Sequence, residues 1–201
     1  MTVTNRQSGT NVHEVADGIY RINTPVLIAE RVRYIALSHV EADECGSLNE
    51  WLVAAPQSVP LCGTVAAMVS IGDLADRAPR ALADGERLSL GKHSVRWFDT
   101  PHLPHAWECG FLTEERTSTL FCGDLLTQGG ADLPPITESD ILGPSEAFRR
   151  GMDYFSQTKN ARVMLERLAS THPETLACMH GSAWRGDGAT LLRALGDALS
   201  A

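Results

Sequence analysis

Short apolar runs alternate along this chain with segments whose apolar residues recur every three or four positions. Short runs of β-branched and large apolar residues are typical of buried strands, and the longer spacing is typical of helices with one buried face. The runs predict strands at 12–15, 19–22, 33–38, 59–62, 87–90, 94–98, 108–113, 119–122 and 175–179. The periodic segments predict helices at 46–55, 64–71, 145–156, 160–170 and 187–199. This alternation of strands and helices predicts an α/β fold.

Near the N-terminus, the pattern predicts some residues better than others. Asp17-Gly18 predicts a tight hairpin turn between the first two strands, because both residues tolerate positive φ angles. Residues 1–11 carry no comparable pattern, and we expect them to be disordered. With 201 residues, the chain is long enough for one domain with a sizeable core, so we expect a single domain over 1–201.

Charge and composition restrict the possible partners. The formal net charge is −8, which argues against nucleic acid as a partner. No apolar run reaches the roughly 18 residues that a membrane span requires, so we expect no membrane partner. The polar N-terminus lacks an apolar signal core, and the five cysteines form no CxxC pair. We therefore expect a cytoplasmic protein with reduced thiols.

Histidine and acidic side chains follow the ends of several predicted strands. They are His39, Glu41, Asp43 and Glu44 after the strand at 33–38, then His102 and His105, Asp124, and His180. Ligand sites in open α/β sheets lie at the carboxyl ends of strands, so these side chains are expected to meet. A lone histidine at a strand end is more often only hydrogen-bonded, and the acids at 41–44 could instead complement a helix dipole. The complete set favours a dinuclear metal site, in which one carboxylate bridges both ions.

The order His-x-Glu-x-Asp, then His, then Asp, then His-Gly resembles the ligand set of the metallo-β-lactamase superfamily. Glu41 in place of a second histidine resembles the diiron branch, which contains the flavodiiron proteins and their oxygen-binding relatives. Residues 12–22 also resemble the first hairpin of the superfamily, and the resemblance extends to about residue 186. It implies an αββα sandwich with the metal site at one edge.

The resemblance also implies a division of the ligands between two metal ions. One ion would be held by His39, Glu41, His105 and Asp124, and the other by Asp43, Asp124 and His180, with Asp124 bridging. His105 is preferred to His102 because it lies four residues before Cys109, as in the family; His102 is then a pocket or outer residue, although the two could be reversed. This ligand set suits iron or manganese better than zinc.

The sequence departs from the family pattern in three places. Glu44 stands where the family usually has histidine, and it could ligate the second ion, fall away from it, or act as an acid or base; we favour a ligand narrowly. The chain carries no phosphate loop suited to flavin mononucleotide, so we expect no flavin in this chain and a separate electron donor. Only about ten residues, 23–33, precede the ligand strand, so we expect a trimmed N-terminal sheet and, at its uncovered edge, a homodimer.

The sequence is compatible with three functions. The first is a diiron protein that binds oxygen or carries out redox chemistry. The second is a hydrolase that attacks a small-molecule substrate with a metal-bound hydroxide, with Glu44 as base and His102 as a further candidate catalytic residue. The third is a non-catalytic metal-binding or sensing protein. The fold alone does not distinguish them, because this scaffold supports many chemistries.

Overall fold

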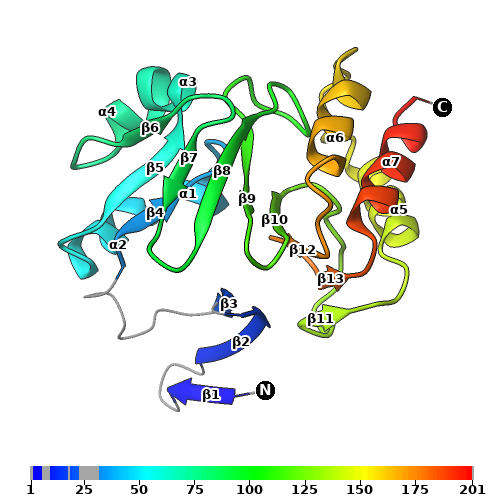
Figure 1. Ribbon diagram of the computed structural model, residues 1–201, viewed down its shortest axis with the longest axis horizontal. Helices are drawn as coiled ribbons and strands as arrows, with labels where there is room; N and C mark the ends of the chain where they lie inside the picture. Colours follow the sequence, from blue (N-terminus) through cyan, green and yellow to red (C-terminus); the bar gives the residue numbers. More distant parts are fainter. Residues whose placement is uncertain (1, 6–9, 18, 23–31, 201) are drawn as a thin grey trace.

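Two β-sheets lie face to face between two layers of helices (Figure 1). The computed structural model of the protein describes residues 2–5, 10–17, 19–22 and 32–200. The smaller of the two sheets is parallel and consists of β4 (Tyr34–Ala36), β5 (Val59–Gly63) and β6 (Arg80–Leu82). The expected αββα sandwich is therefore confirmed. Within the described residues, the smaller sheet of this sandwich has three strands.

The larger sheet combines antiparallel and parallel pairing. Its strands are β7 (Arg87–Ser89), β8 (Ser94–Asp99), β9 (Gly110–Glu114), β10 (Thr119–Gly123), β11 (Ile136–Thr137), β12 (Thr175–Cys178) and β13 (Ala183–Arg185). Their order across the sheet is β11-β13-β12-β10-β9-β8-β7. Strands β7 to β10 pair antiparallel, whereas β10 and β12 run parallel. The carboxyl ends of β10 and β12 therefore reach the same edge of the sheet.

Helices cover the outer face of each sheet. The smaller sheet packs against α1 (Ala42–Cys45), α2 (Leu48–Ala54), α3 (Thr64–Ala66) and the π-helical turn η2 (Ala67–Ile71). The exposed turn α4 (Gly72–Leu74) follows η2. The larger sheet packs against α5 (Leu142–Met152), α6 (Ala161–Ala169) and α7 (Gly188–Ala198). Among the described residues, no helix combines the length and apolar character needed to cross a membrane.

The layer between the two sheets is centred on Trp97 of β8. Its indole ring is fully buried and belongs to a cluster with Leu61, Leu82 and Leu112 from both sheets. The alternation of buried and half-buried residues along β8 places this ring on the inner face. Gly110 on the neighbouring strand β9 leaves room for the ring, because a Cβ atom there would overlap it.

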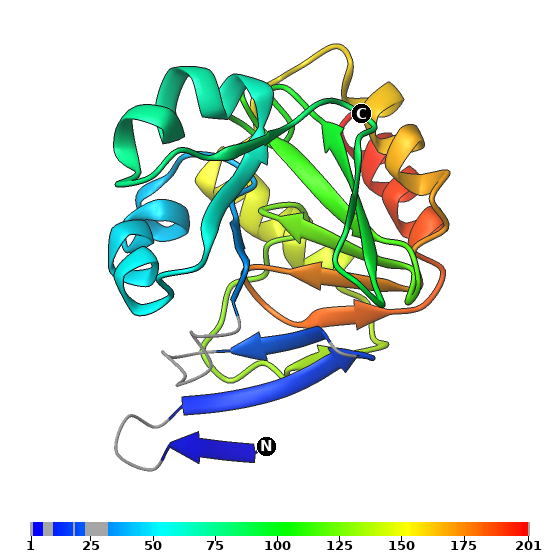
Figure 2. The same ribbon diagram turned by 60° about the vertical axis from the view of Figure 1, so that its left-hand side comes forward.

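The N-terminal residues form a third, separate sheet. Strands β2 (Thr10–Ala16) and β3 (Ile19–Ile22) form the expected antiparallel hairpin, although Gly18 of the expected turn lies outside the described residues. This hairpin lies beside β12 and β13 (Figure 2), and the Arg185 guanidinium donates a hydrogen bond to the Val15 carbonyl, 3.1 Å away. Over its described residues, the hairpin therefore packs beside the larger sheet without joining it.

The structure differs from the sequence-based expectations in several short elements. Residues 1–11 were expected to be disordered, but Thr2–Asn5 form strand β1, paired with β2; its β-branched residues favour that conformation. Strands β6, β11 and β13 were not predicted, because two or three residues are too few to establish a periodicity. The expected helix at 64–71 is divided into α3 and η2. The trimmed segment before β4 falls largely on 23–31, outside the described residues.

We predict that Gly110→Ala destabilises the protein by about 1–3 kcal/mol, because the added methyl group overpacks the core. The new Cβ would overlap the Trp97 ring and lie 2.8 Å from the Phe98 carbonyl oxygen, which is fixed in the sheet. Urea unfolding measures the change. Gly151→Ala in α5 is the matched control, because a Cβ there meets nothing within 4 Å, so it should leave the protein unchanged or slightly more stable. Equal free energies of unfolding for the two variants would contradict the packing described for Trp97.

Candidate metal centre

Four loops at one edge of the sandwich carry the candidate ligands. Gly123 at the end of β10 is in register with Cys178 at the end of β12, so Asp124 and His180 emerge side by side. His39 follows β4 in the other sheet, and the Gly110 amide donates a 2.9 Å hydrogen bond to the Ser38 carbonyl beside it. This hydrogen bond connects the two sheets at the point where their loops meet.

Four candidate ligands form one compact group. They are His39, Glu41, His105 and Asp124, and one ligand atom from each lies within 4.8 Å of all the others. The Nε2 atoms of His39 and His105 are 3.1 Å apart, and each lies 3.2 Å from Oε2 of Glu41. For metal–ligand bonds of about 2.1 Å, neighbouring ligand atoms around one ion lie roughly 3.0–3.4 Å apart. The spacing of this group therefore fits a single metal ion.

A second group lies on the other side of Asp124. Nε2 of His180 is 3.2 Å from Oδ2 of Asp43 and 3.3 Å from Oδ1 of Asp124. The other Asp124 oxygen, Oδ2, lies 3.5 Å from Nε2 of His39 and 3.7 Å from Nε2 of His105. The two oxygens of one carboxylate thus face two different groups, which is the arrangement that a bridging ligand requires.

The polar atoms of the site are incompletely satisfied by the protein itself. Asp124 is buried, and its Oδ1 atom accepts no hydrogen bond from the described residues. Buried polar atoms are normally hydrogen-bonded, and a buried carboxylate oxygen without a hydrogen bond is costly. Three imidazoles and three carboxylates converge here, and all of them are ligands that iron accepts. The donor set therefore fits a pair of metal ions.

Electrostatics within the site couple His39 to the carboxylates. Burial lowers the pKa of His39, but hydrogen bonding to Asp124 and the charge of Glu44 outweigh this and raise the pKa to about 9. Burial also raises the pKa of Asp124, yet the hydrogen bond from His39 and the nearby histidine charges lower it overall. In the protein without metal, His39 is therefore protonated at neutral pH, and a metal ion must displace that proton to bind its imidazole.

The two groups differ in their exposure to solvent. His39 is 1 % exposed, whereas the side chains of His180 and Asp43 are 40 % and 53 % exposed. The first group has four candidate ligands, and the second has three, one of them shared. The first position is therefore the more enclosed and the more richly coordinated of the two.

The chain is similar to several known proteins in sequence or in fold. No family model matches it. Diflavin flavoprotein A 1 of Thermosynechococcus vestitus is 29 % identical over 154 residues, which are 74 % of this chain and 26 % of that protein. The flavodiiron protein from Giardia intestinalis is 21 % identical with a TM-score of 0.70, over 86 % of this chain and 43 % of that one. This chain has the metallo-β-lactamase-like fold of the flavodiiron proteins.

Two further solved structures share this flavodiiron-like fold. Rubredoxin oxygen:oxidoreductase from Desulfovibrio gigas is 19 % identical, with a TM-score of 0.68 over 87 % of this chain and 45 % of that one. The chemotaxis sensor ODP, solved as a peroxy diiron species, is 17 % identical, with a TM-score of 0.68 over 83 % of this chain and 71 % of that one. The chain thus spans about a quarter of the curated relative and less than half of the flavodiiron proteins it resembles.

Glu44 does not lie with the other candidate ligands. Its side chain is 1 % exposed, and its Oε1 atom is 3.6 Å from Nδ1 of His39, on the opposite side of the ring from Nε2. The Ser38 hydroxyl donates to both carboxylate oxygens, at 3.0 and 3.1 Å. This placement differs from the ligand role that we favoured, because the first turn of α1 directs the side chain inward, behind His39.

The two histidines of the 99–110 loop are clearly separated. His105 belongs to the first ligand group, whereas His102 is exposed and does not line the cavity beside the ligands. The backbone explains the difference. His102 has a φ of 64°, and its amide donates a 2.8 Å hydrogen bond to the Ala106 carbonyl in a tight turn. The structure therefore brings His105 to the site and does not bring His102 there, either as ligand or as pocket residue.

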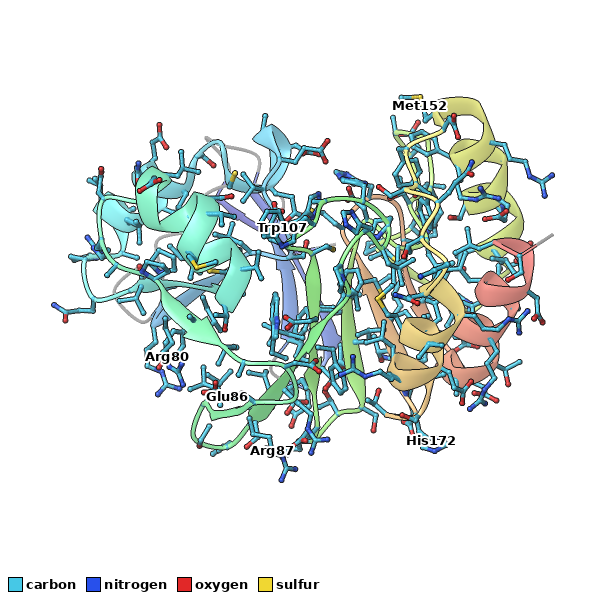
Figure 3. All side chains as sticks on the ribbon, turned by 90° about the horizontal axis from the view of Figure 1, so that it is seen from above. Arg80, Glu86, Arg87, Trp107, Met152 and His172 are labelled. Carbon is cyan, nitrogen blue, oxygen red and sulfur yellow. The ribbon has the colours of Figure 1, made fainter. Side chains whose placement is uncertain are left out.

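A cavity of about 510 Å³ opens beside the ligands. Its walls include Phe148, Met152, Met179 and Tyr154. The Tyr154 hydroxyl donates a 3.0 Å hydrogen bond to the Asp124 carbonyl. Burial raises the pKa of Tyr154 to about 12, so this hydroxyl keeps its proton. Met152 is exposed and lies at the edge of the molecule, at the end of α5 (Figure 3). Phe148, Met152 and Tyr154 could not be predicted as walls, since α5 and the segment after it carry no motif.

We predict that the two metal positions respond differently to single substitutions. Asp124→Ala should empty both positions, because each loses the carboxylate oxygen that faces it. His180→Ala should weaken the second position selectively, because all four ligands of the first group remain. Metal analysis after dialysis against a weak chelator measures both effects. His102→Ala is the matched control and should retain the metal content of the unmodified protein; full retention in Asp124→Ala would contradict the bridging arrangement.

Proposed function

We propose that this chain holds two iron ions and is an oxygen-binding or redox diiron protein. His39, Glu41, His105 and Asp124 would hold the first ion, and Asp43, Asp124 and His180 the second. The observation that carries this proposal is Asp124, whose two oxygens face the two groups at 3.3 Å and 3.5 Å. Three carboxylates with three imidazoles favour iron or manganese over zinc, by the hardness of the oxygen ligands.

The relatives support iron and oxygen as the partners of this site. They include flavodiiron proteins, a rubredoxin oxygen:oxidoreductase and the chemotaxis sensor ODP with its diiron species. When bound, a pair of iron ions supplies the one-electron steps that O2 chemistry requires. The residues of this chain would orient and enclose the centre. Phe148, Met152 and Met179 give the cavity an apolar wall suited to a small apolar molecule such as O2.

Redox turnover would need electrons from outside this site. We propose that a separate electron donor supplies them. Oxygen binding without turnover, as in a sensor, is the second candidate, and the similarity to the chemotaxis sensor ODP favours it. Hydrolysis has less support, because Glu44 is buried behind His39 and does not line the ligand cavity, where a general base would have to act.

We also propose that the protein is a homodimer and acts in the cytoplasm. Within the described residues, β4 pairs only with β5, so its other edge has no described strand beside it. Two-fold association is the commonest way to cover such an edge. Light scattering at micromolar concentration should give twice the mass of the chain, and a stable monomer would contradict this assembly.

We predict that protein purified without oxygen from iron-supplemented cells contains about two iron ions per chain. Admission of O2 should then change the optical spectrum, because the ions are accessible from the cavity. Metal analysis and absorption spectroscopy on one sample measure both quantities. Two colourless zinc ions that persist in iron-rich medium, together with hydrolysis of ester substrates, would instead establish the hydrolase.

A further inference from the structure

A hydrogen-bonded chain extends from the back of His39 into the protein. The Ser38 Oγ atom lies 2.9 Å from Nδ1 of His39 and within 3.1 Å of both oxygens of Glu44. Glu44 is buried, with 1 % of its side chain exposed, whereas Ser38 is half-buried. Gly123 allows the serine to lie here, because a Cβ atom at 123 would come within 2.8 Å of Ser38 Oγ. The serine and the glutamate both line a second cavity, of about 300 Å³, between the two sheets.

With Glu44 ionised, the donors and acceptors of this chain have one consistent order. A hydroxyl has a single hydrogen, and a carboxylate only accepts, so the Ser38 hydrogen is directed to Glu44. Ser38 Oγ can then act only as an acceptor toward His39, and Nδ1 of His39 must carry a hydrogen. With Nδ1 as the donor, the lone pair needed for a metal ion is on Nε2. That nitrogen faces Glu41, His105 and Asp124.

We propose that Glu44 is a positioning residue, which acts through Ser38 to fix the tautomer and orientation of His39 for the first metal ion. The inference rests on the proposed metal centre and extends it to a residue outside the ligand set. Groups that hold the far nitrogen of a ligand histidine generally contribute 10–100-fold in metal affinity. This role requires a hydrogen-bond acceptor at position 44, and both carboxylate oxygens of Glu44 accept from the Ser38 hydroxyl.

Four variants separate this role from simple space filling. Glu44→Gln keeps the volume and an acceptor oxygen, Glu44→Met keeps the volume without a comparable acceptor, and Ser38→Ala removes the intermediate. Glu114→Met is the matched control, since Glu114 is also a buried glutamate beside a histidine, 3.1 Å from Nδ1 of His93. It lies at the opposite end of β9 from Gly110, away from the ligands.

Titration with Co²⁺, followed optically and by competition with Zn²⁺, measures the affinity of each position. Glu44→Met and Ser38→Ala should lower the affinity of the first position by about 10–100-fold. Glu44→Gln should stay within a few-fold of the unmodified protein, and Glu114→Met should not change the affinity. In the Zn²⁺-loaded protein, NMR should detect a slowly exchanging Nδ1 proton on His39, which Ser38→Ala abolishes.

Several results would overturn the proposal. Equal affinities for Glu44→Met and Glu44→Gln would reduce Glu44 to a space-filling residue. Weakening of the second position with the first unchanged would make Glu44 a ligand. A Nδ1 proton signal that Ser38→Ala leaves unchanged would remove the serine from the chain. Failure of the unmodified protein to bind iron would refute the proposed function, whereas the Zn²⁺ and NMR measurements would still decide the role of Glu44.

Discussion

The carboxylate of Asp124 connects both halves of the site, with Oδ1 directed at His180 and Oδ2 at His39. A charged group buried this deeply is stable only if its surroundings compensate for lost hydration. The compensation comes from three separate loops, which the parallel pair β10–β12 and the hydrogen bond from Gly110 to Ser38 hold at one edge. The packing around Trp97 keeps the two sheets, and with them the loops, at a fixed distance.

The site is asymmetric around this carboxylate. On one side, His39 is enclosed by the sandwich and its imidazole contacts Ser38 from behind. On the other side, Asp43 and His180 reach out to solvent beside a partly apolar cavity. The second group also has fewer candidate ligands than the first, because Glu44 is buried behind His39 and does not join it.

The sequence predicted most of this arrangement because the ligand motifs follow strands with strong apolar patterns. The neighbouring positions of Asp124 and His180, for example, follow from two parallel strands ending at the same edge. The direction of Glu44 could not be predicted, since it depends on how the single turn of α1 is oriented against β4. The cavity wall at Tyr154 could not be predicted either, because tertiary packing alone brings that residue to His105, with ring centroids 5.9 Å apart.

Anomalous diffraction at the iron absorption edge, from crystals grown anaerobically with Fe²⁺, tests the central claim most directly. The account predicts two peaks that flank Asp124. One should lie among His39, Glu41 and His105, and the other between Asp43 and His180. A single peak, or two peaks that do not share Asp124, would contradict it.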